Sequence, residues 1–390
     1  MSAAVIEGLD VFRVPPRWTF VRLRCSDGTE GWGEAIVPKR QAAVVGAIED
    51  IGVNITGSPA GRIEDLAQRM HRGGFFRGGP ILGTAAAAIE QALWDAKGRR
   101  HGLPVHEFLG GAVREKLRTY VWVGGDRPED VVEHTRSRLK QGFSAVKLNV
   151  AGQLDFLEPS SSIDAVVERV ASLRSEFGGD LGIAVDFHGR ANHVTARALV
   201  RELEQFSLMW VEEPVSPEDY DGLRDLRRVA GSVPIATGER LTSRWQFKDL
   251  LRDATVDILQ PDVSLTGLFE LEKICRMAEA YDVAVAPHCP NGPVSLAASL
   301  QVGFCCANVV IQEQSRGLHY HEGFEGLPTG ELFDYLADAE PLCSPDGFFA
   351  RPAGPGLGIE VDAGAVAAAV TDWRMPDPDW RHADGRLAEW

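Results

Sequence analysis

Short apolar runs alternate with amphipathic segments along the middle of the chain, from Thr119 to about Gln314. Eight such runs can be distinguished, namely TYVWVGG, SAVKLNV, GIAVDFHG, LMWVEEP, VPIATGE, VDILQPD, VAVAPH and NVVIQEQ. The segments between them, such as PEDVVEHTRSRLKQ and LFELEKICRMAEAYD, carry apolar residues at three- and four-residue spacing, which predicts helices. Eight strands that alternate with helices predict an α/β fold of the TIM-barrel type.

The regions on either side of this repeat have a different pattern. Residues 1–120 begin with strand-like alternation in VFRV and FVRLRC, which the turn Ser26-Asp27-Gly28 separates from GWGEAIV. Helical patterns follow in QAAVVGAIEDI and TAAAAIEQALWDAKG, so this region is predicted to be α+β. Residues 331–390 are rich in Gly, Pro and Trp, and we expect them to return and pack on the N-terminal region.

The net charge of the chain indicates which classes of partner it does not bind. Its 390 residues include 40 Lys and Arg against 56 Asp and Glu, a formal net charge of −16. A surface this acidic repels phosphate backbones and anionic membranes, so we expect neither nucleic acid nor a membrane as partner. The start of the chain does not read as a signal peptide and no apolar run reaches about 20 residues, so we expect a cytoplasmic protein. The six cysteines include no C-x-x-C pair and are expected to be reduced.

Polar residues end six consecutive strand-like runs. They are Asp186, Glu212, Glu239, Asp262, His288 and Glu313, with successive gaps of 26, 27, 23, 26 and 25 residues. Each gap is about one strand-helix unit, so every one of these residues is predicted to lie at the C-terminal end of a barrel strand. That end of the barrel is where active sites are built. A solvated strand end or a helix cap would explain one such residue, but not six in register.

The first three of these residues are carboxylates on consecutive strands. Asp186, Glu212 and Glu239 would repel one another and raise one another's pKa unless a cation lay between them. Oxygen ligands from three rigid strands leave room for water and substrate in an octahedral shell, which favours Mg²⁺. Because no cysteine belongs to this set, zinc is less suitable.

Residues two apart on a strand share a face, which adds side chains to the same cavity. Asp186 and His188 are paired in this way in D-F-H, and Lys147 and Asn149 in K-L-N. For Lys147 a structural salt bridge is the alternative to a contact with substrate.

Asp262 and His288 end adjacent strands. There a carboxylate can bind one ring nitrogen of the imidazole, set its tautomer and raise its basicity. A satisfied core histidine is the alternative, but the acids around His288 favour catalysis.

At these residues the chain resembles the enolase superfamily, mandelate racemase subgroup, and most closely the D-galactonate dehydratases. The likeness runs almost from end to end, through PPRW, RGGPIL, QALWD, WVGGDRP, VKLN, DFHGR, EEPV, GER, ILQPD, MAEAYDV, APHCP, QEQS and WRHADGRLAEW. The resemblance implies a (β/α)7β modified TIM barrel under an α+β capping domain made by both termini. We therefore predict a capping domain at residues 1–120, the barrel at 121–330, and a C-terminal segment at 331–390 that returns to the cap.

The resemblance also implies roles for the residues. Mg²⁺ would bind Asp186, Glu212 and Glu239, and Glu313 would steady an enolate. His288, oriented by Asp262, would take the proton from C2 of an acid sugar, and His188 would protonate the departing 3-hydroxyl. Lys147 and Asn149 would contact the substrate carboxylate or enediolate. Loops around Arg17, Trp18 and residues 71–79 would read the rest of the sugar.

The resulting expectation is a Mg²⁺-dependent lyase that converts D-galactonate to 2-dehydro-3-deoxy-D-galactonate and water. Asn149 stands where many racemising relatives carry a second basic lysine, which favours elimination over epimerisation. The segment VSLTGLFE after Asp262 is one residue shorter than the galactonate dehydratase pattern, so another aldonate or aldarate stays an alternative. Epimerisation on the same scaffold and non-catalytic acid-sugar binding are the others. The resemblance also suggests a homo-oligomer, an octamer or a smaller assembly.

Overall fold

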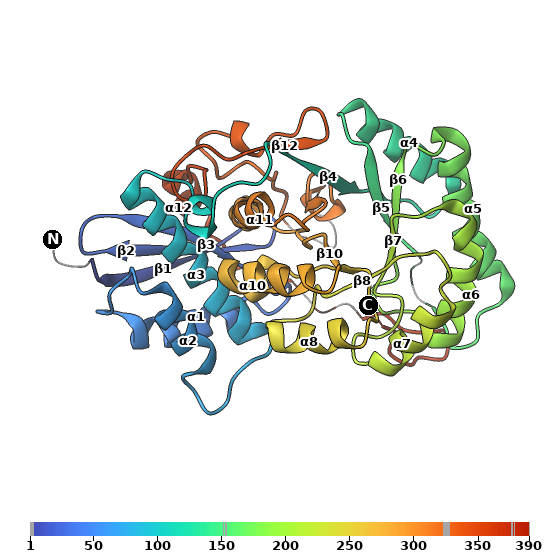
Figure 1. Ribbon diagram of the computed structural model, residues 1–390, viewed down its shortest axis with the longest axis horizontal. Coiled ribbons are helices and arrows are strands. Elements are labelled where there is room, and N and C mark those ends of the chain that lie inside the picture. Colours follow the sequence, from blue (N-terminus) through green and yellow to red (C-terminus); the bar gives the residue numbers. More distant parts are fainter. Residues whose placement is uncertain are drawn as a thin grey trace.

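The computed structural model describes residues 4–150, 152, 154–322, 328–375, 377 and 379–389. At one end of the molecule lie a three-stranded antiparallel sheet and three helices, and helices α4 to α7 of the barrel lie at the other end (Figure 1). The elements of the N-terminal part are β1 (Ile6–Val14), β2 (Trp18–Cys25), β3 (Glu30–Ala35), α1 (Gln41–Ile55), α2 (Ile63–Arg72) and α3 (Pro80–His101). The predicted α+β character of this region is confirmed.

Helix α3 packs directly on strand β3. A Cβ atom added at Gly33 would lie 1.9 Å from the carbonyl oxygen of Ala88, so only glycine permits this close approach of the two backbones. The buried run of alanines in α3 supplies the matching smooth face. Sheet and helix are therefore held together by small residues on both sides.

Eight parallel strands follow one another around the barrel in chain order. They are β4 (Lys116–Trp122), β5 (Ala145–Asn149), β6 (Gly182–Asp186), β7 (Trp210–Glu212), β8 (Ile235–Thr237), β9 (Ile258–Leu259), β10 (Ala284–Val285) and β11 (Gln312–Gln314). Strand β11 pairs with β4. On its other side the chain just before β11 pairs with β10, where Val285 donates to the carbonyl of Asn308 at 2.8 Å and accepts from Val310 at 2.9 Å. These pairings close the barrel.

Helices connect each strand to the next. They are α4 (Pro128–Lys140), α5 (Ser160–Phe177), α6 (His193–Leu203), α7 (Tyr220–Val229), α8 (Arg244–Arg252), the short α9 (Val263–Thr266) with α10 (Leu268–Glu279), and α11 (Pro293–Cys305). The predicted (β/α)7β barrel is confirmed. No helix in the described ranges combines the length and the apolar character that crossing a membrane requires.

One layer of side chains fills the barrel below the polar residues predicted above. This layer consists of Tyr120, Ala145, Ala184, Trp210, Ala236, Ile258, Ala286 and Ile311. Two residues further along the strands come Lys147, Asp186, Glu212, His288 and Glu313, which share the inward face because strand side chains alternate. At β8 the alternation breaks at Gly238, whose φ is 135°, and Glu239 joins the set instead. The polar layer therefore rests on a packed apolar floor.

The C-terminal segment contacts both other parts of the chain. Its strand β12 (Phe348–Ala350) pairs antiparallel with β4. After helix α12 (Ala363–Ala368), the backbone N–H of Thr371 donates to the carbonyl of Arg13 in β1. Near its end Arg386 forms an ion pair with Asp155 at 3.1 Å.

Short 3₁₀ turns complete the described chain: η1 (Val105–Leu109), η2 (Glu204–Phe206), η3 (His319–Glu322) and η5 (Glu340–Leu342). The three-domain division stays a prediction. All six cysteines are free thiols, as expected.

Candidate active site

Three carboxylates meet at the C-terminal edge of β6, β7 and β8. One oxygen from each of Asp186, Glu212 and Glu239 lies within 4.8 Å of the other two. Asp186 and Glu212 are buried and are paired neighbours in the sheet, and Glu239 is partly buried. Parallel pairing of adjacent strands therefore brings together residues that are 26 and 27 positions apart.

Lys147 lies inside this cluster. Its Nζ is 2.7 Å from Glu212, 2.9 Å from Glu313 and 3.5 Å from Asp186, and its side chain is only 5% exposed. Burial alone would lower the pKa of Lys147, but the carboxylates of Glu212 and Glu313 raise it well above its ordinary value. Lys147 is thus a permanent cation. Lys147 therefore forms the salt bridges that its structural alternative predicts. Its contact with substrate stays a prediction.

One lysine does not neutralise the carboxylates. Burial and the nearby charge of Asp186 raise the pKa of Glu212. The pKa of Asp186 is lowered despite its burial, because His188 and Lys147 both contact it. Glu239 Oε2 is buried and has no hydrogen-bond partner among the described residues. Converging carboxylate oxygens with an unsatisfied charge fit a divalent cation.

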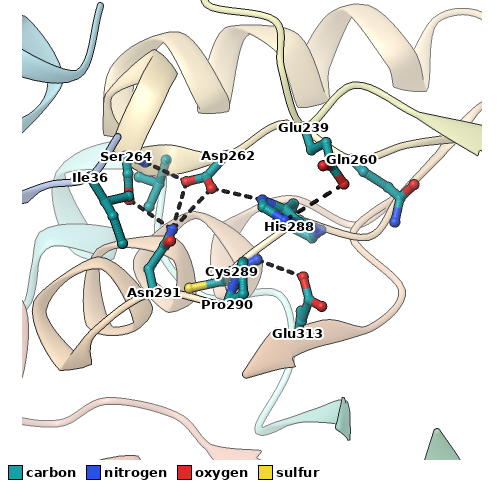
Figure 2. Close-up of polar contacts among 12 residues, drawn as sticks. Ile36, Glu239, Gln260, Asp262, Ser264, His288, Cys289, Pro290, Asn291 and Glu313 are labelled. Carbon is teal, nitrogen blue, oxygen red and sulfur yellow. Dashed lines mark hydrogen bonds and ion pairs between the residues drawn. The ribbon is translucent and has the colours of Figure 1, made fainter. Parts of the chain in front are cut away.

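His288 binds Asp262 with one ring nitrogen and faces Glu239 with the other. Its Nδ1 lies 2.8 Å from Asp262 Oδ2, and its Nε2 lies 3.6 Å from Glu239 Oε2 (Figure 2). Burial alone would lower the pKa of His288, but Glu239 and the hydrogen bond with Asp262 raise it to about 10. The ring is therefore oriented by one carboxylate and directed at the cluster.

Asp262 is itself held by donors that the sequence analysis missed. The backbone N–H of Ser264 donates to Oδ1 at 2.7 Å, and the amide of Asn291 lies 3.0 Å from both carboxylate oxygens (Figure 2). Asn291 is 2% exposed and follows His288 by three residues in the segment APHCPNG. Its closeness to His288 in the sequence was the one signal that could have indicated it.

His188 contacts Asp186, whereas His288 faces Glu239. Its backbone φ of 51° is left-handed, and its N–H donates to Asp186 Oδ1 at 2.9 Å. Its Nε2 is 2.9 Å from Asp186 Oδ2, and its Nδ1 is 3.0 Å from Arg190. Arg240 donates to the His188 carbonyl at 2.8 Å and pairs with Glu213 at 2.8 Å. The sequence analysis missed both arginines.

Other groups orient the acids from outside the cluster. Glu313 Oε2 accepts the backbone N–H of Cys289 at 2.8 Å (Figure 2). Glu212 Oε2 accepts from the Gln260 amide at 2.7 Å and from the Trp210 indole at 3.0 Å. Gln260 lies two residues before Asp262, so strand alternation was a usable signal for it.

Asn149, Arg17 and Trp18 are the remaining predicted residues, and Asn149 is the paired neighbour of Asp186 in the sheet. Asn149 accepts the indole N–H of Trp122 at 3.3 Å. Arg17 donates to the carbonyl of Pro290 at 3.1 Å, close to the segment that carries His288. Trp18 has no exposed surface and packs on His321, Phe20 and Tyr335, so the structure does not bring it to the cluster. Its predicted substrate contact has no support in this arrangement.

A closed (β/α)7β barrel whose strand ends carry two histidines and an acidic cluster that could hold a metal ion is the architecture of a barrel enzyme. Residues 15–110 match the N-terminal domain of mandelate racemase / muconate lactonizing enzymes, and residues 130–365 match the enolase C-terminal domain-like family. The chain belongs to the enolase superfamily and to its mandelate racemase / muconate lactonizing enzyme group.

Relatives match the chain over its whole length. It is 44% identical over 389 residues to proteins named D-galactonate dehydratase from Ralstonia pickettii (strain 12J) and Cronobacter sakazakii (strain ATCC BAA-894), covering 99% of this chain and 100% of each relative. Among solved structures, a mandelate racemase/muconate lactonizing enzyme from Jannaschia sp. CCS1 matches with a TM-score of 0.84 and 28% identity. That match covers 95% of this chain and 99% of the other. Fold and family thus agree with the resemblance seen in the sequence.

Proposed function

We propose that this protein is a Mg²⁺-dependent D-galactonate dehydratase, which forms 2-dehydro-3-deoxy-D-galactonate and water. The observation that carries the chemistry is that two histidines flank one carboxylate cluster, His188 against Asp186 and His288 facing Glu239. The choice of substrate is supported by the 44% identity to proteins named D-galactonate dehydratase.

The substrate carboxylate would bind beside the cluster. Asp186, Glu212 and Glu239 would hold Mg²⁺, whose charge, when it is bound, offsets the negative charge that builds up on the substrate carboxylate. The ammonium group of Lys147 would add a second positive charge there, with Asn149 as a hydrogen-bonding partner. A proton on the carbon next to a carboxylate is very weakly acidic. The positive charges of the cation and of Lys147 are therefore both needed to make its removal feasible.

Proton transfer would take place in two halves. Because the bound cation would offset the charge of Glu239, which raises the pKa of His288, the ring could be neutral in the loaded enzyme. His288, oriented by Asp262, would then accept the C2 proton, and the electron pair of the broken C–H bond would form an enediolate steadied by Glu313. The C3–O bond would then break as the electron pair returns, and His188 would give a proton to the departing hydroxyl, which leaves as water. The enol product takes up a proton at C3 to become the 2-keto-3-deoxy acid.

Elimination needs one base and one acid, whereas epimerisation needs a base on each face of C2. The position of Asn149, which has no basic group, supports elimination.

The partners would be small acid sugars, and we propose that the reaction takes place in the cytoplasm in a homo-oligomeric enzyme. Light scattering of the purified protein tests the assembly, since a mass of one chain alone would refute it.

The test is an incubation of the enzyme and Mg²⁺ with D-galactonate, D-gluconate, L-threonate and D-glucarate, followed by a 2-keto-3-deoxy acid assay. We expect product from D-galactonate and none after the divalent cation is removed. Product from another acid alone would retain the reaction and reject the substrate. In deuterated water, recovered acid labelled at C2 with inverted configuration would identify an epimerase instead. No reaction with any acid would reject catalysis in favour of acid-sugar binding.

A further inference from the structure

One sector of the barrel mouth carries aromatic side chains where the rest carries charges. It lies above β11, β4 and β5, which are neighbours in the sheet. The indole of Trp122, at the end of β4, donates to Asn149 at the end of β5, and its ring centre lies 5.1 Å from that of His319. His319 follows β11, and its ring lies 6.0 Å from Tyr320. We call Trp122, His319 and Tyr320 the aromatic wall.

The aromatic wall is tied to the segment that carries the proposed base. Arg17 lies over the Tyr320 ring at 3.7 Å and donates to the carbonyl of Pro290, two residues after His288. At its other end the wall adjoins Lys147, because Trp122 and Lys147 are paired neighbours in the sheet. The wall therefore lies at the end of β4 and after β11, and it contacts Asn149 at the end of β5 and, through Arg17, Pro290 after β10.

The proposed chemistry leaves the end of β4 for the rest of the substrate. The cation ligands and the base come from β6, β7, β8 and β10, and Lys147 and Glu313 extend the charged ring to β5 and β11, so the carboxylate and C2 of an acid sugar would lie among these strand ends. The hydroxyl-bearing carbons beyond C3 would extend toward β4, whose end carries the uncharged Trp122. The indole of Trp122 suits the C–H side of a sugar chain, and the imidazole of His319 beside it can exchange hydrogen bonds with the hydroxyls. Tyr320 is buried between Arg17 and His321 and supports His319 from behind.

The charge state of His319 fits that task. Burial lowers the pKa of His319 to about 4, and the nearby charges of Arg17 and His188 act in the same direction. At neutral pH its ring therefore offers one donor and one acceptor and carries no charge. A neutral ring does not compete with Lys147 for the substrate carboxylate, so it discriminates between hydroxyl arrangements without reversing the orientation of the substrate.

We propose that His319 is a specificity-determining residue that hydrogen-bonds the hydroxyl-bearing tail of the acid sugar. The inference rests on the proposed function, because it takes the carboxylate end of the substrate to lie at Asp186, Glu212 and Glu239.

The test compares two acids that share the reacting carbons. L-threonate keeps the C2 and C3 configuration of D-galactonate and lacks C5 and C6. His319→Phe retains an aromatic ring next to Trp122 and loses both nitrogens, so kcat/KM for D-galactonate should fall by about 10- to 100-fold. The same variant should change kcat/KM for L-threonate, or its C2 deuterium exchange where turnover is slow, by less than about 3-fold. His319→Gln, which retains a donor and an acceptor, should restore much of the loss.

The matched control is His321→Phe, two residues further on. The His321 ring stacks on Tyr320 at 4.7 Å and packs on Trp18, so its loss should affect both acids by the same factor. An equal loss on both acids in His319→Phe would reduce His319 to a structural role, and no loss on D-galactonate would also overturn the proposal. Absence of any reaction in the wild-type protein would reject the proposed function itself, a separate outcome.

Discussion

The glutamate Glu90, buried in helix α3, makes the stability of the fold depend on pH. It is 1% exposed, and its Oε1 accepts hydrogen bonds from the Trp94 indole at 3.1 Å and the Phe269 backbone at 2.7 Å. Burial raises its pKa from 4.5 to about 8. Between these values the folded chain keeps a proton that the unfolded chain has released. The free energy of unfolding therefore falls as pH rises from 4.5 to 8, by up to about 5 kcal/mol for a shift of this size at 1.36 kcal/mol per pH unit.

Glu90→Gln removes this titration and retains the accepting oxygen. We expect the free energies of unfolding of variant and wild type to be similar near pH 4.5. The free energy of unfolding of the variant should exceed that of the wild type by an amount that grows up to pH 8 and stays constant above it. Urea denaturation at pH 5, 6, 7, 8 and 9 measures the difference, with Glu168→Gln on the exposed face of α5 as control. A difference that does not change with pH would refute the reasoning, because a lost or gained contact alone has no pH dependence.

Three further predictions concern the proposed site. His288→Asn and His188→Asn should each abolish turnover while calorimetric titration still detects Mg²⁺ binding, and full activity in either variant would reject the role given to that histidine. Asn291→Leu removes the amide that holds both oxygens of Asp262. It should lower kcat/KM by about 10- to 100-fold and enlarge the deuterium isotope effect at C2, whereas an unchanged isotope effect would mean that Asn291 only supports the fold. Removing divalent cations with a chelator should abolish activity and lower the melting temperature, because the carboxylates lose the ion that stabilises the folded state. Mg²⁺ should restore both, and a melting temperature unaffected by either treatment would contradict a cation at this cluster.

Strand alternation made the barrel and its inner polar layer predictable. Ala184 precedes Asp186 by two residues and Ala286 precedes His288 by two, so an apolar floor residue and a polar residue above it share one face. The near-constant spacing of the strand-end residues follows from the similar length of each strand-helix unit. The proximity of Asp262 and His288 could be anticipated because their strands are adjacent.

Other parts of the site could not be predicted in this way. Trp18 follows Arg17 directly and looks equally suited to contact a substrate, yet it is buried against the rings of His321 and Tyr335, which lie more than 300 residues further along the chain. His319 joins Trp122 because the barrel closes between β11 and β4. Such contacts depend on closure and packing, which leave no periodic signal in the sequence.

The amino-acid sequence by itself determined the order of strands and helices, the residues that end each strand, and the family to which the chain belongs. These properties follow from local periodicity and from residue types at fixed spacing. Only the tertiary structure decided that Lys147 pairs with three acids, that Asn291 holds Asp262, and that Trp18 is part of the core. Each of these depends on the direction of a side chain relative to a distant segment, and that direction is set when the barrel closes and the N-terminal part packs against it.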